Sequence, residues 1–360
     1  MSRRPDGPLR HGWTTGACAA AATRAAFEAL HTGRFPDPVS ITLPRGERPS
    51  FALAMHDIGA GWAEAGIIKD AGDDPDVTHG AMIVCRVAPN PAGGIAYRAG
   101  EGVGTVTRPG LALAVGEPAI NPKPRQMIAA ALADAATALG RAGDAVVTVS
   151  LPGGAELAKR TLNARLGIIG GLSILGTTGI VIPYSCSSWI HSIHRGIDVA
   201  RAAGLAHLAG STGRVSEEAV QRLHRLPEEA LIDMGDFAGG MLKYLRAHPV
   251  PRLTIAGGFG KLAKLAAGHL DLHSGASEVD VAGLATALAG LGADPSLIEQ
   301  ARAAGSGGAV LALAEAAGQP LAALIARRAR ETVLATLAGG IAVDVAAFDR
   351  AGKLLAHVGP

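Results

Sequence analysis

The hydrophobic pattern of the first third of the chain predicts short β-strands between two helices. Apolar runs of strand length are separated by clusters of proline, glycine and asparagine, which are typical of turns. Helical patterns precede and follow these runs. We expect helices at residues 17–30 and 125–139, and strands at residues 39–43, 51–55, 67–69, 81–87, 95–98 and 145–150. This order predicts a two-layer α+β domain with helices on one face of a mixed or antiparallel sheet.

The second half repeats a short apolar strand, a turn that contains glycine, and a helix. Strands are expected at residues 205–208, 230–234 and 253–256, and helices at residues 217–225, 237–247, 262–268, 281–291, 297–304 and 321–337. Such repetition predicts a three-layer, Rossmann-like α/β domain with a parallel sheet and a ligand site at the carboxyl ends of its strands. We assign residues 1–165 to the first domain and residues 166–360 to the second.

Composition narrows the choice of partners. The chain is 48% hydrophobic and 18% charged, which predicts a folded protein. Its 33 lysines and arginines nearly balance 31 acidic residues, so there is no general attraction to nucleic acid or to an acidic membrane. An anionic partner would have to be bound by a local basic cluster.

Three features indicate a cytoplasmic protein. Cys18, Cys85 and Cys186 are odd in number and far apart, which argues against disulfides and a structural zinc site. Arg3-Arg4 suggests an export signal, but prolines follow at once and Arg24 interrupts the next apolar run. Residues 166–190 carry no charge, yet they hold too many glycines for a membrane helix.

Two N-terminal segments carry unusual polar patterns. Residues 10–16, RHGWTTG, begin a helix, where exposed amides suit a carboxylate or phosphate, although for this segment alone a simple helix cap is the favoured explanation. Residues 69–79 contain four aspartates within seven positions, which suits a nearby cation such as a sulfonium, an amine or a metal. A solvated loop is the alternative.

Two further segments precede or follow the expected boundary. In residues 115–125 three prolines stiffen the chain and fix Glu117, Asn121 and Arg125 before a helix, which favours binding. Residues 167–179 are rich in glycine and hydroxyls but do not match a dinucleotide-binding fingerprint.

The last segment joins a glycine turn at residues 256–261 to the pattern His269-x-Asp271-x-His273. That spacing would place three metal ligands on one face of a strand, and His191 and His194 lie one helical turn apart. Surface histidines are a more frequent explanation, so we expect no metal.

Taken together, the segments resemble the CbiD family, the cobalt-precorrin-5B C(1)-methyltransferases of cobalamin biosynthesis. The resemblance is carried by GWTTG at 12–16, IKDAGDDPDVT at 68–78, GEPAINP at 116–122, GGLSILGTTGIV at 170–181 and GKLAKLAAG at 260–268. Two departures concern the substrate. Many family members have a Pro-Met-Ser pattern and acidic residues where this chain has PYSCSSWIHSIHR at 183–195, and they often have histidine-isoleucine where it has Gly258-Phe259.

The resemblance implies that S-adenosylmethionine donates a methyl group to C-1 of (cobalt-)precorrin-5B, giving (cobalt-)precorrin-6A. The partner is then a small tetrapyrrole with several carboxylates, without nucleic acid or membrane. The ring carbon is itself the nucleophile, so alignment and exclusion of water suffice. Candidate catalytic residues are Asp73, Asp74 and Glu117. Candidate donor-binding residues are Gly170, Gly171, Ser173, Gly176, Thr177, Thr178, Asp70 and Asp76. Candidate substrate-binding residues are Arg10, Thr14, Thr15, Lys69, Asn121, Lys123, Arg125, Lys261 and His269.

Two other classes stay open. One is a non-catalytic tetrapyrrole carrier, and the other is a metal-dependent hydrolase or chelatase that uses His269, Asp271 and His273. The sequence also leaves open whether the substrate carries cobalt, which domain binds the donor, what residues 185–195 do, and whether the chain forms a homo-oligomer.

Overall fold

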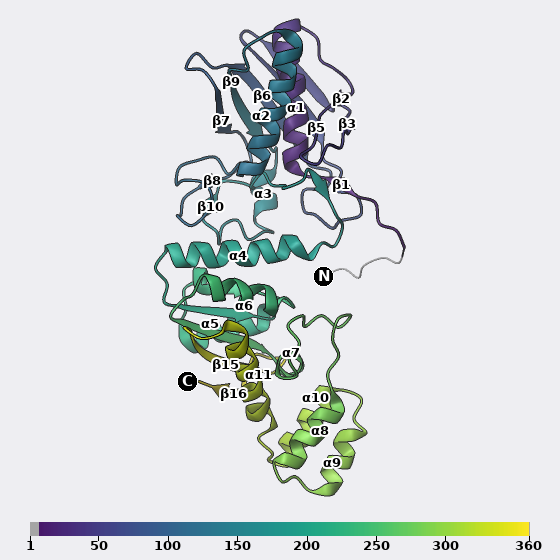
Figure 1. The fold of residues 1–360 in the computed structure, drawn as a ribbon, viewed down its shortest axis with the longest axis vertical. Coiled ribbons are helices and arrows are strands. Elements are labelled where there is room, and N and C mark those ends of the chain that lie inside the picture. Colours follow the sequence, from purple (N-terminus) through teal and green to yellow (C-terminus); the bar gives the residue numbers. More distant parts are fainter. Residues whose placement is uncertain (1–6, 360) are drawn as a thin grey trace. The chain divides into compact units, whose positions relative to one another are not determined.

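The computed structural model describes residues 7–359 and shows a mixed α/β protein (Figure 1). Arg3-Arg4, considered above for export, lies outside the described residues. The chain divides after Ser185 into two compact units, here called unit 1 and unit 2. The division falls later than the expected one at 165/166, because Ile168–Ile169 and Ile180–Val181 pair with strands of unit 1. No helix among the described residues is long and apolar enough to cross a membrane.

Unit 1 is built on a five-stranded sheet with the order β4-β5-β6-β9-β7. Its strands are β4 (Met55–Gly59), β5 (Trp62–Ile68), β6 (Met82–Pro89), β7 (Ile95–Ala99) and β9 (Ala145–Ser150). Neighbours are antiparallel except β7 and β9, which are parallel. Helices α1 (Thr15–Thr32) and α2 (Pro122–Leu139) lie side by side on the sheet (Figure 1) and bury an apolar core against it.

The composition of α1 explains this close packing. Residues 17–22 and 25–26 are buried alanines apart from Cys18, so helix and sheet approach closely without large side chains. Thr14 caps the helix by accepting a hydrogen bond from the amide of Ala17, and Gly33 ends it with φ +73°. The predicted helices at 17–30 and 125–139 are confirmed, and each begins two or three residues earlier than predicted.

Short strand pairs and one short helix complete unit 1. The pairs are β1 (Gly12–Trp13) with β11 (Ile180–Val181), β2 (Val39–Ser40) with β3 (Ser50–Phe51), and β8 (Thr105–Val106) with β10 (Ile168–Ile169); the helix is α3 (Gly154–Ala158). The first and last of these pairs attach the glycine-rich residues 167–181 to unit 1.

Unit 2 contains a second five-stranded sheet with the order β13-β12-β14-β15-β16. Its strands are β12 (His207–Ser211), β13 (Leu231–Asp233), β14 (Arg252–Gly258), β15 (Ala342–Phe348) and β16 (Leu354–Val358). The first four are parallel and β16 is antiparallel. The helices are α4 (Cys186–Ala202), α5 (Arg214–His224), α6 (Ala238–Ala247), α7 (Phe259–Ala266), α8 (Val281–Gly290), α9 (Pro295–Arg302), α10 (Gly307–Ala316) and α11 (Leu321–Leu337), with a 3-10 turn η1 (Glu228–Ala230).

The sequence pattern missed β4, α4, α10, β15 and β16. Strand β15 is buried along almost its whole length and contains three alanines and Asp344, so it lacks both alternation and the usual β-branched composition. Helix α4 begins with Cys186 and serines, which resemble a loop.

Candidate functional site

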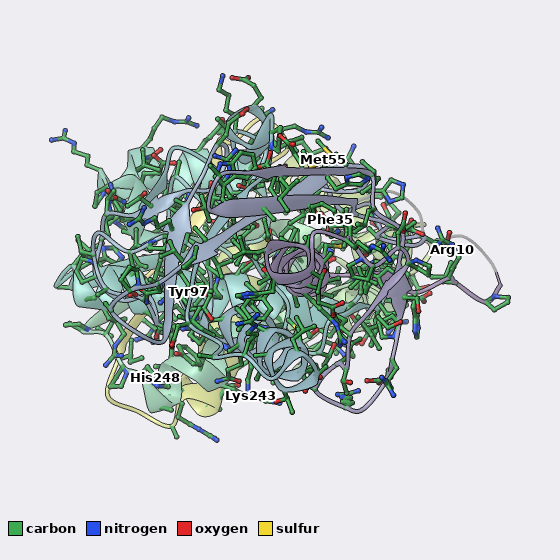
Figure 2. All side chains as sticks on the ribbon, turned by 90° about the horizontal axis from the view of Figure 1, so that it is seen from above. Arg10, Phe35, Met55, Tyr97, Lys243 and His248 are labelled. Carbon is green, nitrogen blue, oxygen red and sulfur yellow. The ribbon has the colours of Figure 1, made fainter. Side chains whose placement is uncertain are left out.

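The acidic loop at residues 69–79 is held by groups of unit 1. The guanidinium of Arg10 (labelled in Figure 2) donates to both carboxylate oxygens of Asp70, one of them at 2.9 Å. This arginine lowers the pKa of Asp70 to about 2. The carboxylate of Asp73 accepts a hydrogen bond from the backbone amide of Arg10 at 2.6 Å, and the backbone amide of Asp73 donates to the carbonyl of Arg10 at 3.0 Å. The predicted donor-side and substrate-side residues Asp70 and Arg10 therefore bind each other.

The other two aspartates of this loop are also compensated within the chain. Asp74 accepts the amide of Tyr184 at 2.8 Å. Asp76 accepts Lys69 Nζ at 2.7 Å and both donors of Thr78, at 2.6 and 2.7 Å. Burial opposes ionisation of Asp76, but Lys69 and Thr78 outweigh it and keep its pKa below the ordinary value. Each of the four carboxylates thus has a hydrogen-bond donor within the chain, and Asp70 and Asp76 also have a basic partner.

The starts of α1 and α2 meet at one backbone segment. The amide of Leu175 donates to Thr15 Oγ1 at 2.8 Å. The carbonyl of Leu175 accepts two hydrogen bonds, one from the Thr15 hydroxyl at 3.1 Å and one from the amide of Gly16 at 2.9 Å. Ile174, next to it, accepts the amide of Asn121 at 3.1 Å. Two helix amino ends, each with a partial positive charge, therefore converge on residues 174–175.

Directly after this segment the chain offers unused amides. Among residues 7–359, the backbone N–H groups of Gly176, Thr177 and Thr178 donate to no protein group. Thr177 is exposed and its two neighbours are half-buried. We call these three amides, beside the start of α1, the amide cradle. Free amides next to helix amino ends are suited to a carboxylate.

Most other glycines of residues 167–179 are explained by packing. A Cβ on Gly171 would lie 2.2 Å from the carbonyl oxygen of Gly102. At Gly176, φ is +129° and a Cβ would lie 2.3 Å from Thr14 Oγ1. Ser173 is buried and donates to Asn163 Oδ1 at 3.4 Å. Of the predicted donor-binding glycines, only Gly170 faces open space.

The stiff loop before α2 is folded around Arg125. Its guanidinium donates to the carbonyl of Ile120 at 2.8 Å, to Glu117 Oε1 at 3.2 Å and to the carbonyl of Pro118 at 3.3 Å. The side chain also lies over the ring of Tyr97. Lys123, by contrast, is exposed and donates to Gln126 at 3.0 Å. Arg125 shapes the loop, whereas Lys123 is accessible to a ligand.

Unit 2 has an open edge where β12 and β14 end. Gly213 and Gly258 precede helices α5 and α7, and a Cβ on either would meet nothing within 4 Å. Ser211, the last residue of β12, is fully buried, and its hydroxyl has no hydrogen-bond partner among the described residues. The sequence pattern indicated residues 256–261 here but not Ser211 and Gly213, although Gly213 also follows a strand.

The remaining residues of unit 2 that were predicted to bind a substrate or a metal have other partners or are exposed. Lys261 forms an ion pair with Asp236 and donates to the carbonyl of Leu272 at 2.9 Å. His269, Asp271 and His273 are exposed, and they are not among the described residues that converge as a metal-ligating group. The predicted hydrolase or chelatase triad is not assembled in the described part of the chain.

Comparison with known proteins identifies the family. Residues 2–183 match the family model CbiD, and residues 271–359 match CbiD, C-terminal domain. A protein named cobalt-precorrin-5B C(1)-methyltransferase from Bradyrhizobium sp. is 62% identical over 97% of this chain and 93% of its own length. The protein of that name from Brucella anthropi is 58% identical over 97% and 96% of the two chains.

A solved structure is also similar. The cobalamin biosynthesis protein (cbiD) from Archaeoglobus fulgidus is 27% identical, with a TM-score of 0.40 over 71% of this chain and 78% of that one. The two family models together with relatives of nearly equal length establish that this chain belongs to the CbiD family.

Proposed function

We propose that the chain methylates C-1 of (cobalt-)precorrin-5B, with S-adenosylmethionine as donor and (cobalt-)precorrin-6A as product. The observation that carries this proposal is the identity of 58–62% to proteins named cobalt-precorrin-5B C(1)-methyltransferase, over 97% of the chain. If the chain were a carrier or a hydrolase, its function would differ from the one in the names of relatives that match 97% of its length.

The chemistry asks little of the side chains. The electron pair of the ring carbon attacks the methyl group, the bond from carbon to carbon forms, and the bond to sulfur breaks to release S-adenosylhomocysteine. The protein therefore aligns the two reactants and keeps water away. Since Asp73 and Asp74 accept backbone amides of Arg10 and Tyr184, they serve this reaction chiefly by holding the loop, and Glu117 by fixing Arg125.

We place the amino-acid carboxylate of the donor in the amide cradle. Support comes from the unused amides of Gly176, Thr177 and Thr178 beside the start of α1. Thr14, Thr15 and Asn121 keep the cradle in place through residues 174–176, and Lys123 remains free to bind a carboxylate arm of the tetrapyrrole.

A competing placement of the donor uses the open edge of unit 2. The parallel strands have the flavodoxin-like order of doubly wound folds, whose ligands bind where the order reverses, here between β12 and β14. Asp233 lies 20 residues after Gly213, the spacing at which dinucleotide sites place an acid for a ribose. The donor carries an adenosine, so this edge is an alternative to the amide cradle as its binding site.

Titration calorimetry with S-adenosylhomocysteine separates the two placements. Thr177→Pro removes one cradle amide, while the control Thr177→Ala keeps it. Losing one charge-assisted hydrogen bond costs about 1.5–3 kcal/mol, so Thr177→Pro should weaken binding roughly 10- to 150-fold and the control should not. If Gly258→Val weakens binding instead, while the helix control Gly260→Ala does not, the donor lies at the edge of unit 2.

A further inference from the structure

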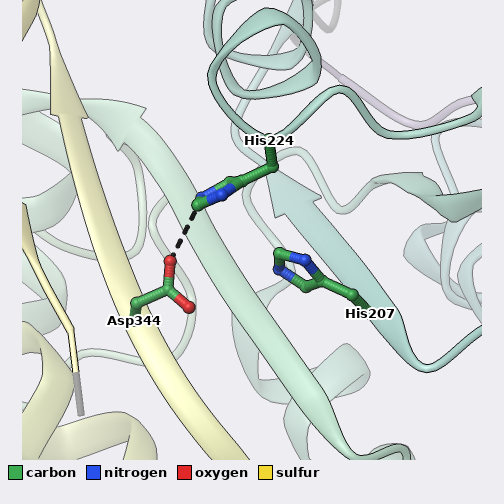
Figure 3. A group of neighbouring side chains, drawn as sticks. All are labelled: His207, His224 and Asp344. Carbon is green, nitrogen blue, oxygen red and sulfur yellow. Dashed lines mark ion pairs between the residues drawn. The ribbon is translucent and has the colours of Figure 1, made fainter.

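A cluster of three histidines and one aspartate lies in unit 2 at the amino-terminal edge of its sheet, away from the strand ends described above. His207 is the first residue of β12, and His224 is the last residue of α5. Asp344 is in β15 and His357 in β16. Four elements that are distant in sequence thus contribute one side chain each, and Figure 3 shows three of them turned toward one another.

The carboxylate of Asp344 is the centre of this cluster and is fully buried. Its Oδ1 accepts Arg252 Nε at 2.9 Å. Its Oδ2 lies 2.8 Å from His357 Nε2 and accepts the hydroxyl of Thr254 at 2.8 Å. That hydroxyl in turn lies 2.7 Å from His207 Nε2. Arg252 thus holds one oxygen of the carboxylate and leaves the other facing the imidazoles.

One atom of the cluster is left without a hydrogen bond. His224 Nε2 is buried and lies 3.2 Å from Asp344 Oδ2, the contact drawn as a dashed line in Figure 3. The contact is within the distance of an ion pair but is not a hydrogen bond, so within the described residues this nitrogen has no hydrogen-bond partner. A buried polar atom without a partner is costly, and it indicates a group that is missing from the site.

We propose that His207, His224 and Asp344 bind one divalent transition-metal ion of the zinc or cobalt(II) type, while His357 holds the Asp344 carboxylate through a hydrogen bond. Two imidazole nitrogens and one carboxylate oxygen, completed by a water molecule, form a ligand set typical of these ions. Ligand atoms of His207, His224 and Asp344 lie within 4.8 Å of one another, whereas atoms around a tetrahedral zinc are about 3.4 Å apart. The rings would close by roughly 1 Å on binding, and His224 Nε2 would gain its partner.

The position of the site gives it a structural role. Its ligands tie the end of α5 to the parallel strands β12 and β15. Arg252 donates a hydrogen bond to Asp344 Oδ1 and so orients the carboxylate. Carboxylates that ligate metals are commonly held by such an outer hydrogen bond. The metal would stabilise unit 2 and takes no part in methyl transfer.

The test uses the full-length chain, stripped with a chelator and then exposed to zinc chloride. We expect one zinc per chain after gel filtration, measured by elemental analysis, and a higher melting temperature. Cobalt(II) in place of zinc should show the intense visible bands of a tetrahedral site. His224→Ala and His207→Ala should each weaken zinc binding at least 100-fold, and His224→Gln should do the same while keeping a polar side chain.

The matched control removes the exposed histidines of the other candidate triad. His269→Ala combined with His273→Ala should leave both the stoichiometry and the rise in melting temperature unchanged. A wild-type chain that retains no zinc and melts at the same temperature with and without it would overturn the proposal, and the cluster would be a hydrogen-bond network only. Zinc that persists in both single variants but is lost in the control would overturn it as well.

Discussion

Single residues of the acidic loop stabilise unit 1. The buried Lys69 offers the clearest test of this. Its side chain is 1% exposed and is paired with Asp76, which is 27% exposed. Lys69→Met would leave that carboxylate largely buried without its cation, so the melting temperature should fall in line with a loss of about 3 kcal/mol. The control Arg10→Met breaks an exposed pair and should cost less than about 1 kcal/mol. Equal losses in the two variants would contradict this account.

The same carboxylates set a pH dependence. Arg10 lowers the pKa of Asp70 to about 2, and that of Asp76 is lowered as well, whereas both are near 3.9 in an unfolded chain. Groups with a depressed pKa stabilise the fold above the unfolded value and lose that contribution as the pH falls through the folded value. Stability should therefore decline between about pH 4 and pH 2, and thermal melts should show a shallower decline in Asp76→Asn.

The three cysteines should differ in reactivity. Burial raises the pKa of Cys18 and of Cys85 to about 12, while Cys186 is exposed. Thiolate is the reactive form, so iodoacetamide at pH 8 should label the native chain once, at Cys186, and the urea-unfolded chain at all three positions. Mass spectrometry of the intact chain counts the labels. Rapid labelling of Cys18 or Cys85 in the native chain would show that α1 does not seal this part of the core.

Residue types in the sequence indicated which positions matter but not which positions pair. Arg10 and Asp70 were each selected, for different ligands, and the structure joins them across 60 positions. His207, His224 and His357 gave no signal, since each is a lone histidine in its own segment and only the sheet brings them to Asp344. Pairings of this kind depend on topology, which local patterns do not contain.

At the scale of elements, the loop before α2 depends on Arg125. We expect Arg125→Gln to destabilise the chain by about 1.5–3 kcal/mol, because its three nitrogens hold Ile120, Glu117 and Pro118 to the helix. Differential scanning fluorimetry measures the loss, with Lys123→Gln as an exposed control that should melt like wild type. A variant that melts normally but has a raised Michaelis constant would instead make Arg125 a direct ligand of the substrate.

Strong periodicity made some elements predictable. The alanine face of α1 and the strand–turn–helix pattern from residue 207 to residue 266 were visible in the sequence. Buried β15 and the polar start of α4 were not, because full burial removes alternation and tertiary packing overrides local preference. The observed boundary between the units falls later than the predicted one for the same reason. Residues 168–181 resemble a linker in sequence, but strands within them pair with β8 and β1.

At the scale of the whole molecule, each unit has its own apolar core and its own candidate ligand groups. Unit 1 offers the amide cradle and Lys123, and unit 2 offers the open strand edge and the histidine cluster. Binding of the donor, retention of a metal and methyl transfer are therefore separable by variants that lie in different parts of the chain.

The most direct test of the central claim is methyl transfer itself. The full-length chain is incubated with cobalt-precorrin-5B and S-adenosylmethionine whose methyl carbon is carbon-13, and the product is analysed by mass spectrometry and carbon NMR. We expect one labelled methyl group at C-1 and one equivalent of S-adenosylhomocysteine. Unmethylated substrate, under conditions in which the 62% identical Bradyrhizobium relative transfers the label, would contradict the account.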